Sequence, residues 1–87
     1  MFEAVEFIDR KADPVAPPEE RLLGSFADEA EALAVARAER ESFTNTEDYA
    51  WWIVRQAGAR LARWIADSKS PKEFVLDLTS GELVEVE

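Results

Sequence analysis

Carboxylates are the most abundant side chains in this sequence that could do chemistry. The 87 residues include 19 Asp and Glu against 10 Lys and Arg, and they contain no Cys and no His. The lack of imidazole and thiol groups excludes His-based acid–base catalysis, thiolate chemistry and the ordinary nitrogen and sulfur metal sites. Any catalysis would have to use carboxylates, hydroxyls or amines.

Several acidic residues could form an acid–base pair or converge on a hard cation such as Ca²⁺. The candidates are Asp28, Glu29, Glu31, Asp48, Asp67 and Asp77. None of them has the D-x-[DN]-x-[DN]-G spacing of a calcium loop, and no glycine-rich phosphate loop or nucleophile elbow occurs. We therefore predict a solvated acidic surface, with no catalytic residue, no metal site and no cofactor.

Arginines interleaved with tryptophans form the second candidate group, because both residue types dominate protein contact surfaces. The predicted interaction surface consists of Trp51, Trp52, Trp64, Arg55, Arg60 and Arg63. These side chains could stack on bases or hold an acidic peptide. Alternatively, the arginines cover a sheet through cation–π contacts or through ion pairs with Asp67 or Glu73. We favour this second interpretation.

The net charge of the chain bears on which kinds of partner it can bind. A formal charge of -9 and a pI near 4.4 oppose binding to phosphate backbones, which requires concentrated Lys and Arg. Nucleic acid is therefore not an expected partner. Our first hypothesis is a non-catalytic protein-interaction module that binds another protein or itself, as a possible homodimer. The alternatives are an acidic nucleic-acid mimic that binds a nucleic-acid-binding protein, and a small carboxylate-dependent enzyme.

The N-terminal segment and the hydropathy bear on the compartment. Residues 1–6, MFEAVE, carry acids where a secretory signal would need bases. No apolar run approaches the roughly 18 residues of a membrane span. We predict a soluble, cytoplasmic protein without a membrane partner.

Residues 49–67 hold all three tryptophans, and the rest of the chain must position them. A helix and a hairpin compete here, since the apolar residues lie near helical spacing whereas residues 51–54, WWIV, are rich in β-formers. Gly58 would cost a helix about 1 kcal/mol relative to alanine but suits a hairpin turn. We predict a hairpin in which residues 49–55 pair with residues 60–66. Trp51 and Trp52 then lie on opposite faces, and a helix beginning near Thr46 is the alternative.

The remaining elements follow from periodicity and from proline and glycine positions. The most regular helical pattern begins at Ser25, a candidate N-cap, and runs to Glu41. Its alanine-rich stripe predicts close packing on a sheet. The other expected segments are a strand at residues 2–9, a mobile proline-rich loop at 10–20, a short strand or apolar patch at 21–24, and strands at 73–79 and 82–86 joined by a turn at Ser80-Gly81.

Together these elements predict an α+β fold: a single domain over residues 1–87, with an antiparallel sheet of four or five strands and one helix on one face. The approximate order is β-α-β-β-β-β. One helix cannot cover both faces of a strand that carries Trp51 and Trp52. Either the proline-rich loop or another protein must cover the second face.

The C-terminal half also carries a resemblance. The segment DYAWWIVRQAGARLARWIADS, followed by KEFVLDLTSGELVEV, resembles small uncharacterised proteins of high-GC Gram-positive bacteria. The resemblance implies a bacterial, cytoplasmic setting. It implies no activity and no functional residues.

Overall fold

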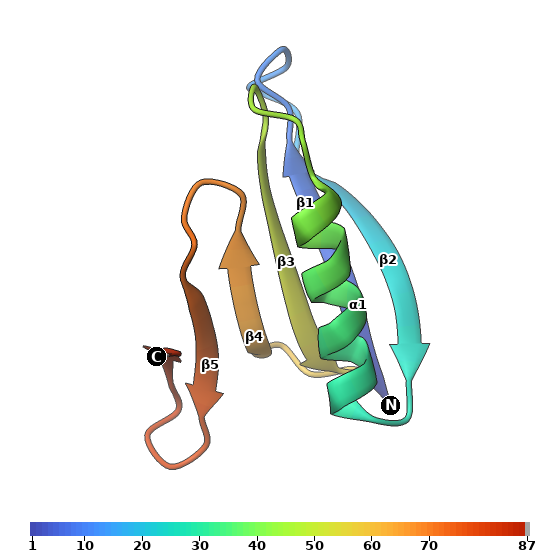
Figure 1. Cartoon of the computed structure of the whole chain (residues 1–87), viewed down its shortest axis with the longest axis vertical. Helices are drawn as coiled ribbons and strands as arrows, with labels where there is room; N and C mark the ends of the chain where they lie inside the picture. Colours follow the sequence, from blue (N-terminus) through green and yellow to red (C-terminus); the bar gives the residue numbers. More distant parts are fainter. Residues whose placement is uncertain (87) are drawn as a thin grey trace.

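The computed structural model describes residues 1–86. Within them the chain forms one helix and six strands in the order β-β-α-β-β-β-β (Figure 1). The elements are β1 (Phe2–Asp9), β2 (Glu19–Phe26), α1 (Glu29–Ser42), β3 (Tyr49–Gln56), β4 (Ala62–Asp67), β5 (Glu73–Asp77) and β6 (Glu82–Glu85). The α+β class with one helix on an antiparallel sheet is confirmed. The prediction of four or five strands in the order β-α-β-β-β-β is wrong.

The strand missing from the predicted order is β2. The sequence predicts only a short strand or an apolar patch at residues 21–24. β2 pairs antiparallel with β1 and forms one edge of the sheet. Its first three residues, Glu19, Glu20 and Arg21, are exposed. An edge strand tolerates such charges because one of its sides is open to solvent. The same charges next to three prolines resemble a loop in sequence.

The sheet has the strand order β2-β1-β3-β4-β5-β6, and all neighbours are antiparallel. β3 to β6 form a meander, whereas β1 and β3 are far apart in the sequence and lie side by side (Figure 1). Their register runs from Phe2 opposite Gln56 to Asp9 opposite Tyr49. β3 therefore occupies the interior of the sheet, as its two apolar faces require.

The predicted tryptophan hairpin is confirmed, because β3 and β4 pair directly. Gly58 in the connecting turn has a φ of 81°, a conformation that side chains with a Cβ rarely adopt. β4 begins at Ala62 instead of residue 60, and a bulge between Val54 and Arg55 shifts the register. In the turn between β5 and β6, Gly81 likewise has a positive φ, of 74°.

The helix begins later than predicted. Ser25 is not its N-cap, since this residue belongs to β2 and pairs with Glu3 of β1. Asp28 caps the helix instead, and its side chain accepts a hydrogen bond of 2.9 Å from the Ala30 backbone N–H. α1 ends at Ser42. No helix in residues 1–86 has the length and apolar character needed to cross a membrane.

The core lies between α1 and one face of the sheet. Ala32 and Ala36 of α1 are fully buried against strand alanines, so the helix backbone approaches the sheet closely, as the alanine stripe predicted. Trp52 and Trp64 fill the remaining space and are 0% and 2% exposed. Phe43, just after the helix, packs edge-on against Trp52 with ring centroids 5.3 Å apart.

The proline-rich loop projects from the end of the sheet near the connection from α1 to β3 (Figure 1). Most of residues 10–18 are exposed, and Val15 is 93% exposed. The side chain of Asp48 holds the base of the loop by accepting hydrogen bonds from the Lys11 backbone N–H and from Arg10. The loop therefore does not supply the cover that the second face of the sheet lacks.

Candidate functional site

The face of the sheet that points away from α1 is the candidate site, and we call it the open face. Side chains alternate along a strand, so on β3 Trp52 points to the helix and Trp51 points away from it. Cross-strand neighbours share a face, which extends the open face in register from Trp51 to Phe7 on β1 and from Ile53 to Ile65 on β4. Along its middle lie two residues that their neighbours already bury, Val5 and Ile53 (1% and 9% exposed), and four that are half-buried, Phe7, Trp51, Ile65 and Phe74.

Aromatic rings are concentrated around Trp51. Phe7 stacks on Trp51 with ring centroids 5.2 Å apart and an interplanar angle of 9°. Tyr49, two residues along β3, is tilted against the same Trp51 side chain, with ring centroids 5.6 Å apart and an interplanar angle of 36°. The indole is thus fixed between two neighbours although it stays partly exposed. Such preorganised aromatic area loses little conformational entropy on binding.

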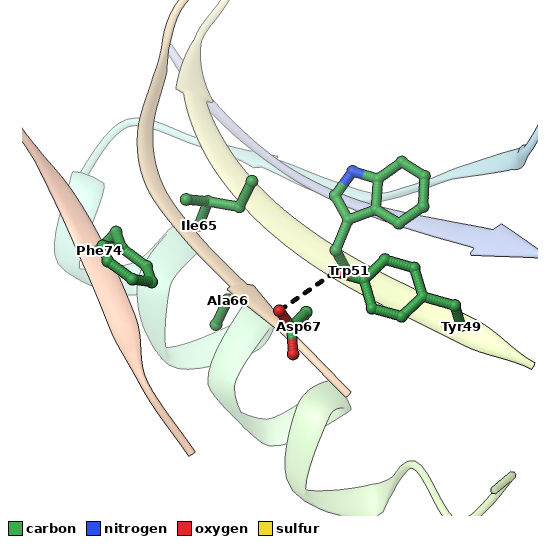
Figure 2. A pocket seen from close by; sticks show the side chains of 6 residues that line it. All are labelled: Tyr49, Trp51, Ile65, Ala66, Asp67 and Phe74. Atoms are coloured by element: carbon green, nitrogen blue, oxygen red, sulfur yellow. Dashed lines mark hydrogen bonds between the residues drawn. The ribbon is translucent and has the colours of Figure 1, made fainter. Parts of the chain in front are cut away.

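A groove runs beside Trp51 across β4 (Figure 2). Tyr49 and Trp51 stand on one side of β4 and Phe74 of β5 stands on the other, with Ile65 between them. The groove has a volume of about 320 Å³. Its lining residues are Tyr49, Trp51, Ile65, Ala66, Asp67 and Phe74. It is mostly apolar, with one carboxylate.

That carboxylate, on Asp67, is held by three donors. Its Oδ1 accepts the backbone N–H groups of Lys69 and Ser70 at 2.8 and 2.9 Å, and its Oδ2 accepts the Tyr49 hydroxyl at 3.1 Å (Figure 2). Burial and the hydrogen bond to the Asp67 carboxylate raise the pKa of Tyr49. The tyrosine therefore remains a neutral donor at physiological pH.

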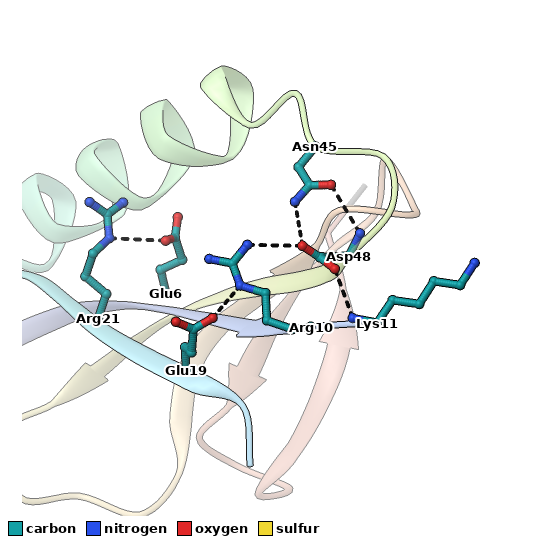
Figure 3. A network of polar contacts seen from close by, with 7 residues as sticks. All are labelled: Glu6, Arg10, Lys11, Glu19, Arg21, Asn45 and Asp48. Carbon is teal, nitrogen blue, oxygen red and sulfur yellow. Dashed lines mark hydrogen bonds and ion pairs between the residues drawn. The ribbon is translucent and has the colours of Figure 1, made fainter. Parts of the chain in front are cut away.

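Two tryptophan–carboxylate–arginine groups occupy the helix side of the sheet. The Trp52 indole N–H donates to the buried Glu6 carboxylate at 2.9 Å, and Arg21 donates to the same carboxylate at 3.1 Å (Figure 3). The Trp64 indole N–H donates to Glu73 at 2.9 Å, and Arg37 donates to Glu73 at 2.8 Å. Every polar group involved is paired, so these groups stabilise the core.

The Glu73 carboxylate has a perturbed pKa. The hydrogen bond from Arg37 lowers the pKa of Glu73 most, burial opposes this shift, and the Trp64 indole N–H and the charge of Arg40 add to it. Arg40 itself donates to the backbone oxygens of Asp67 and Lys72, at 3.0 and 3.4 Å. These bonds tie the end of α1 to the turn between β4 and β5.

A second polar network joins the two loops at the tip of the sheet (Figure 3). Asp48 accepts hydrogen bonds from the Lys11 backbone, Asn45 and Arg10, and these donors lower the pKa of Asp48. Arg10 also pairs with Glu19. The Asp48 carboxylate therefore anchors the two loops, and it lines a shallow cavity between them together with Arg10, Lys11, Ala12 and Glu47.

The six residues predicted as an interaction surface do not share one surface. Trp51 and Arg55 belong to the open face, where Arg55 pairs with Glu3 at 3.0 Å. The other four lie elsewhere: Trp52 and Trp64 in the core, Arg63 beside the helix, and Arg60 exposed in the turn after β3. Arg63 pairs with Glu29 at 3.0 Å and lies over the Phe2 ring at 5.8 Å.

The predicted carboxylates are dispersed. Asp28 caps α1, Glu29 pairs with Arg63, and Asp77 accepts the backbone N–H of Thr79, which lowers the pKa of Asp77. Within residues 1–86, no three acidic groups come together in a way that could hold a metal ion. Of the six candidates, Asp67 alone lines the apolar groove.

The predicted surface lacked Phe7, which stacks on Trp51, and every groove residue except Trp51: Tyr49, Ile65, Ala66, Asp67 and Phe74. Alternation along β1, β4 and β5 does place Phe7, Ile65 and Phe74 on an apolar side of their strands. Their meeting, however, depends on β1 pairing with β3 and β4 pairing with β5 in one register. No local pattern specifies these non-local pairings.

Comparison with protein-family models, with curated proteins and with solved structures finds no match for this chain.

Proposed function

We propose that the protein is a non-catalytic interaction module that binds another protein through its open face. The observation that carries the proposal is the apolar groove beside Trp51, which is lined by partly exposed aromatic side chains on a sheet that has a helix on its other face only. Large aromatic side chains supply most of the binding energy in protein contacts. An enzyme of this composition would instead need converging carboxylates in its pocket.

The setting of the proposed module is bacterial and cytoplasmic. The resemblance of the C-terminal half to small proteins of high-GC Gram-positive bacteria supports this part of the proposal. It is independent of the argument from the groove.

A second copy of the chain is the other candidate for the open face, since a sheet face can pack on itself about a two-fold axis. Each copy carries a formal charge of -9, so self-association brings like charges together. A partner of different sequence avoids this repulsion. We therefore favour a heterologous partner over a homodimer.

Acidic mimicry of nucleic acid would require many carboxylates free to face a basic protein. Several acids of this chain are instead paired with its own arginines: Glu3, Glu6, Glu19, Glu29, Glu39 and Glu73. These pairs reduce the negative surface that a mimic could offer. A nucleic-acid mimic does not need an apolar groove, whereas an interaction module does. The groove therefore favours the interaction module over the mimic.

The proposal is tested by selecting a displayed library of random twelve-residue peptides on the wild-type protein, with counter-selection on Trp51→Glu. Peptides enriched on the wild type should lose binding to Trp51→Glu and keep binding to Val15→Glu, which adds the same charge at an exposed apolar residue outside the open face. Enriched peptides that bind all three proteins equally, or no enrichment, would contradict the proposal.

Sedimentation velocity at high protein concentration tests the occupant. A monomer is expected for the wild type. A dimer that Trp51→Glu abolishes would identify a second copy as the partner of the open face. A dimer that persists in Trp51→Glu would place self-association on another surface.

A further inference from the structure

We propose that the groove on the open face receives an arginine side chain from a basic segment of the partner protein. This inference rests on the proposed function, because it assigns the partner chemistry of the same face. Three observations support it: the aromatic walls of the groove, the orientation of the Asp67 carboxylate, and the charge around the groove.

The walls of the groove suit a planar cation. The face of an aromatic ring is electron-rich and attracts a cation within about 6 Å of its centroid, most strongly for tryptophan. Tyr49 and Trp51 stand on one side of the groove and Phe74 on the other (Figure 2). A guanidinium group is flat and weakly hydrated, so it stacks on such rings more readily than the ammonium group of lysine.

The Asp67 carboxylate lines the same groove and is oriented before any ligand binds. Its three donors are the backbone N–H groups of Lys69 and Ser70 and the Tyr49 hydroxyl. A carboxylate has about four acceptor positions, which leaves it capacity for a further donor. No Lys or Arg of residues 1–86 forms an ion pair with Asp67, whereas Glu73 on the helix side is paired with Arg37.

The charge around the groove also favours a basic partner. In register, Asp9 stands opposite Tyr49 and Glu85 stands opposite Phe74, so acids flank the aromatic residues on both sides. Lys72 pairs with Glu85 at 3.7 Å. With a formal charge of -9, the whole chain attracts cationic segments and repels acidic ones.

The test uses two capped hexapeptides in NMR titrations of the ¹⁵N-labelled protein. One peptide alternates arginine with leucine, and the other has citrulline, which is isosteric and uncharged, in place of each arginine. The arginine peptide should shift the Trp51 indole N–H resonance and the Phe74 amide resonance. The citrulline peptide should bind about tenfold more weakly, the loss expected for a charge-assisted contact at a partly exposed site.

Two variants locate the contact. Asp67→Asn keeps an acceptor for the Lys69 and Ser70 N–H groups and should weaken the arginine peptide about five- to tenfold without changing the citrulline peptide. Val15→Glu should leave both affinities unchanged.

Equal binding of the two peptides at the groove would overturn the arginine assignment and leave the interaction module standing. Binding of the arginine peptide that survives Trp51→Thr would overturn it as well, because the contact would then lie elsewhere on the acidic surface. The absence of any shift at Trp51 with either peptide also overturns it. The display selection uses a random library that is not restricted to arginine, so it tests the open face separately.

Discussion

Trp51 and Trp52 are consecutive residues on β3, and they belong to opposite faces of the sheet with opposite uses. Trp52 is 0% exposed, and its indole N–H donates to a buried carboxylate that is itself paired with an arginine. Trp51 is partly exposed, stacks on Phe7 and borders an open groove. The helix face thus satisfies both the apolar and the polar requirements of its tryptophan, whereas the open face leaves area and acceptor capacity unused.

This difference separates stability from recognition. Fully burying a large apolar side chain is worth about 1.5–3 kcal/mol, a sizeable part of the stability of a small domain. A partly exposed tryptophan on a sheet face contributes less of this to folding. The unused part is available to a partner that covers the groove.

Replacing each tryptophan separately should give very different losses of stability. Trp52→Thr should lower the free energy of unfolding by about 3 kcal/mol or more, because it leaves a cavity under α1 and removes the indole donor of the buried Glu6 carboxylate. Trp51→Thr should lower it by less than about 1 kcal/mol. Urea denaturation followed by far-UV circular dichroism measures both. Equal losses would mean that the open face is as much a core as the helix face.

Period-two alternation made the two faces of β3 predictable. It placed Trp51 and Trp52 on opposite sides, and Gly58 indicated the turn that follows. The sequence did not show which face of β3 α1 covers. That choice depends on the pairing of β1 with β3, which places Glu6 opposite Trp52. Such pairing is a property of the whole chain, and a local window does not contain it.

The helix start shows the same limit at short range. Ser25 and Asp28 both begin acceptable capping sequences. Ser25 pairs with β1 as part of β2, so Asp28 is the N-cap of α1. The groove was beyond prediction for the same reason, because Trp51, Ile65 and Phe74 come from three strands. Their adjacency requires the sheet order.

The carboxylates on the two faces should also differ in their contribution to stability. Glu6→Gln should lower the free energy of unfolding by about 1–2 kcal/mol, because it weakens the contact to Arg21 at a residue that is only 5% exposed. Glu3→Gln, next to Arg55 on the open face, should cost less than about 1 kcal/mol. Thermal unfolding of both variants beside the wild type tests this order. A larger loss for Glu3→Gln would mean that the open face contributes more to stability than the helix face.

Acid titration should act through the helix face. The pKa of Glu73 is lowered in the folded state below its ordinary value of 4.5, so the folded protein favours the charged form. Its contribution is present above about pH 4.5 and is lost as the pH falls through the lowered value. The effect should stay below about 1 kcal/mol, since Arg37 is substantially exposed. Glu73→Gln should flatten the fall in stability below pH 4.5 in urea denaturation series; an unchanged slope would assign the acid sensitivity to other carboxylates.

Shortening the proline-rich loop should have the least effect on stability. Replacing residues 13–18 by one glycine shortens the proline-rich loop but retains Arg10 and Lys11, which contact Asp48. Because the loop projects from the end of the sheet, the free energy of unfolding should change by no more than about 0.5 kcal/mol. Iodide quenching reports mainly on Trp51, since Trp52 and Trp64 are buried, and it should be unchanged. A clear loss of stability together with increased quenching would show that the loop covers the groove, and the open face would then need no partner.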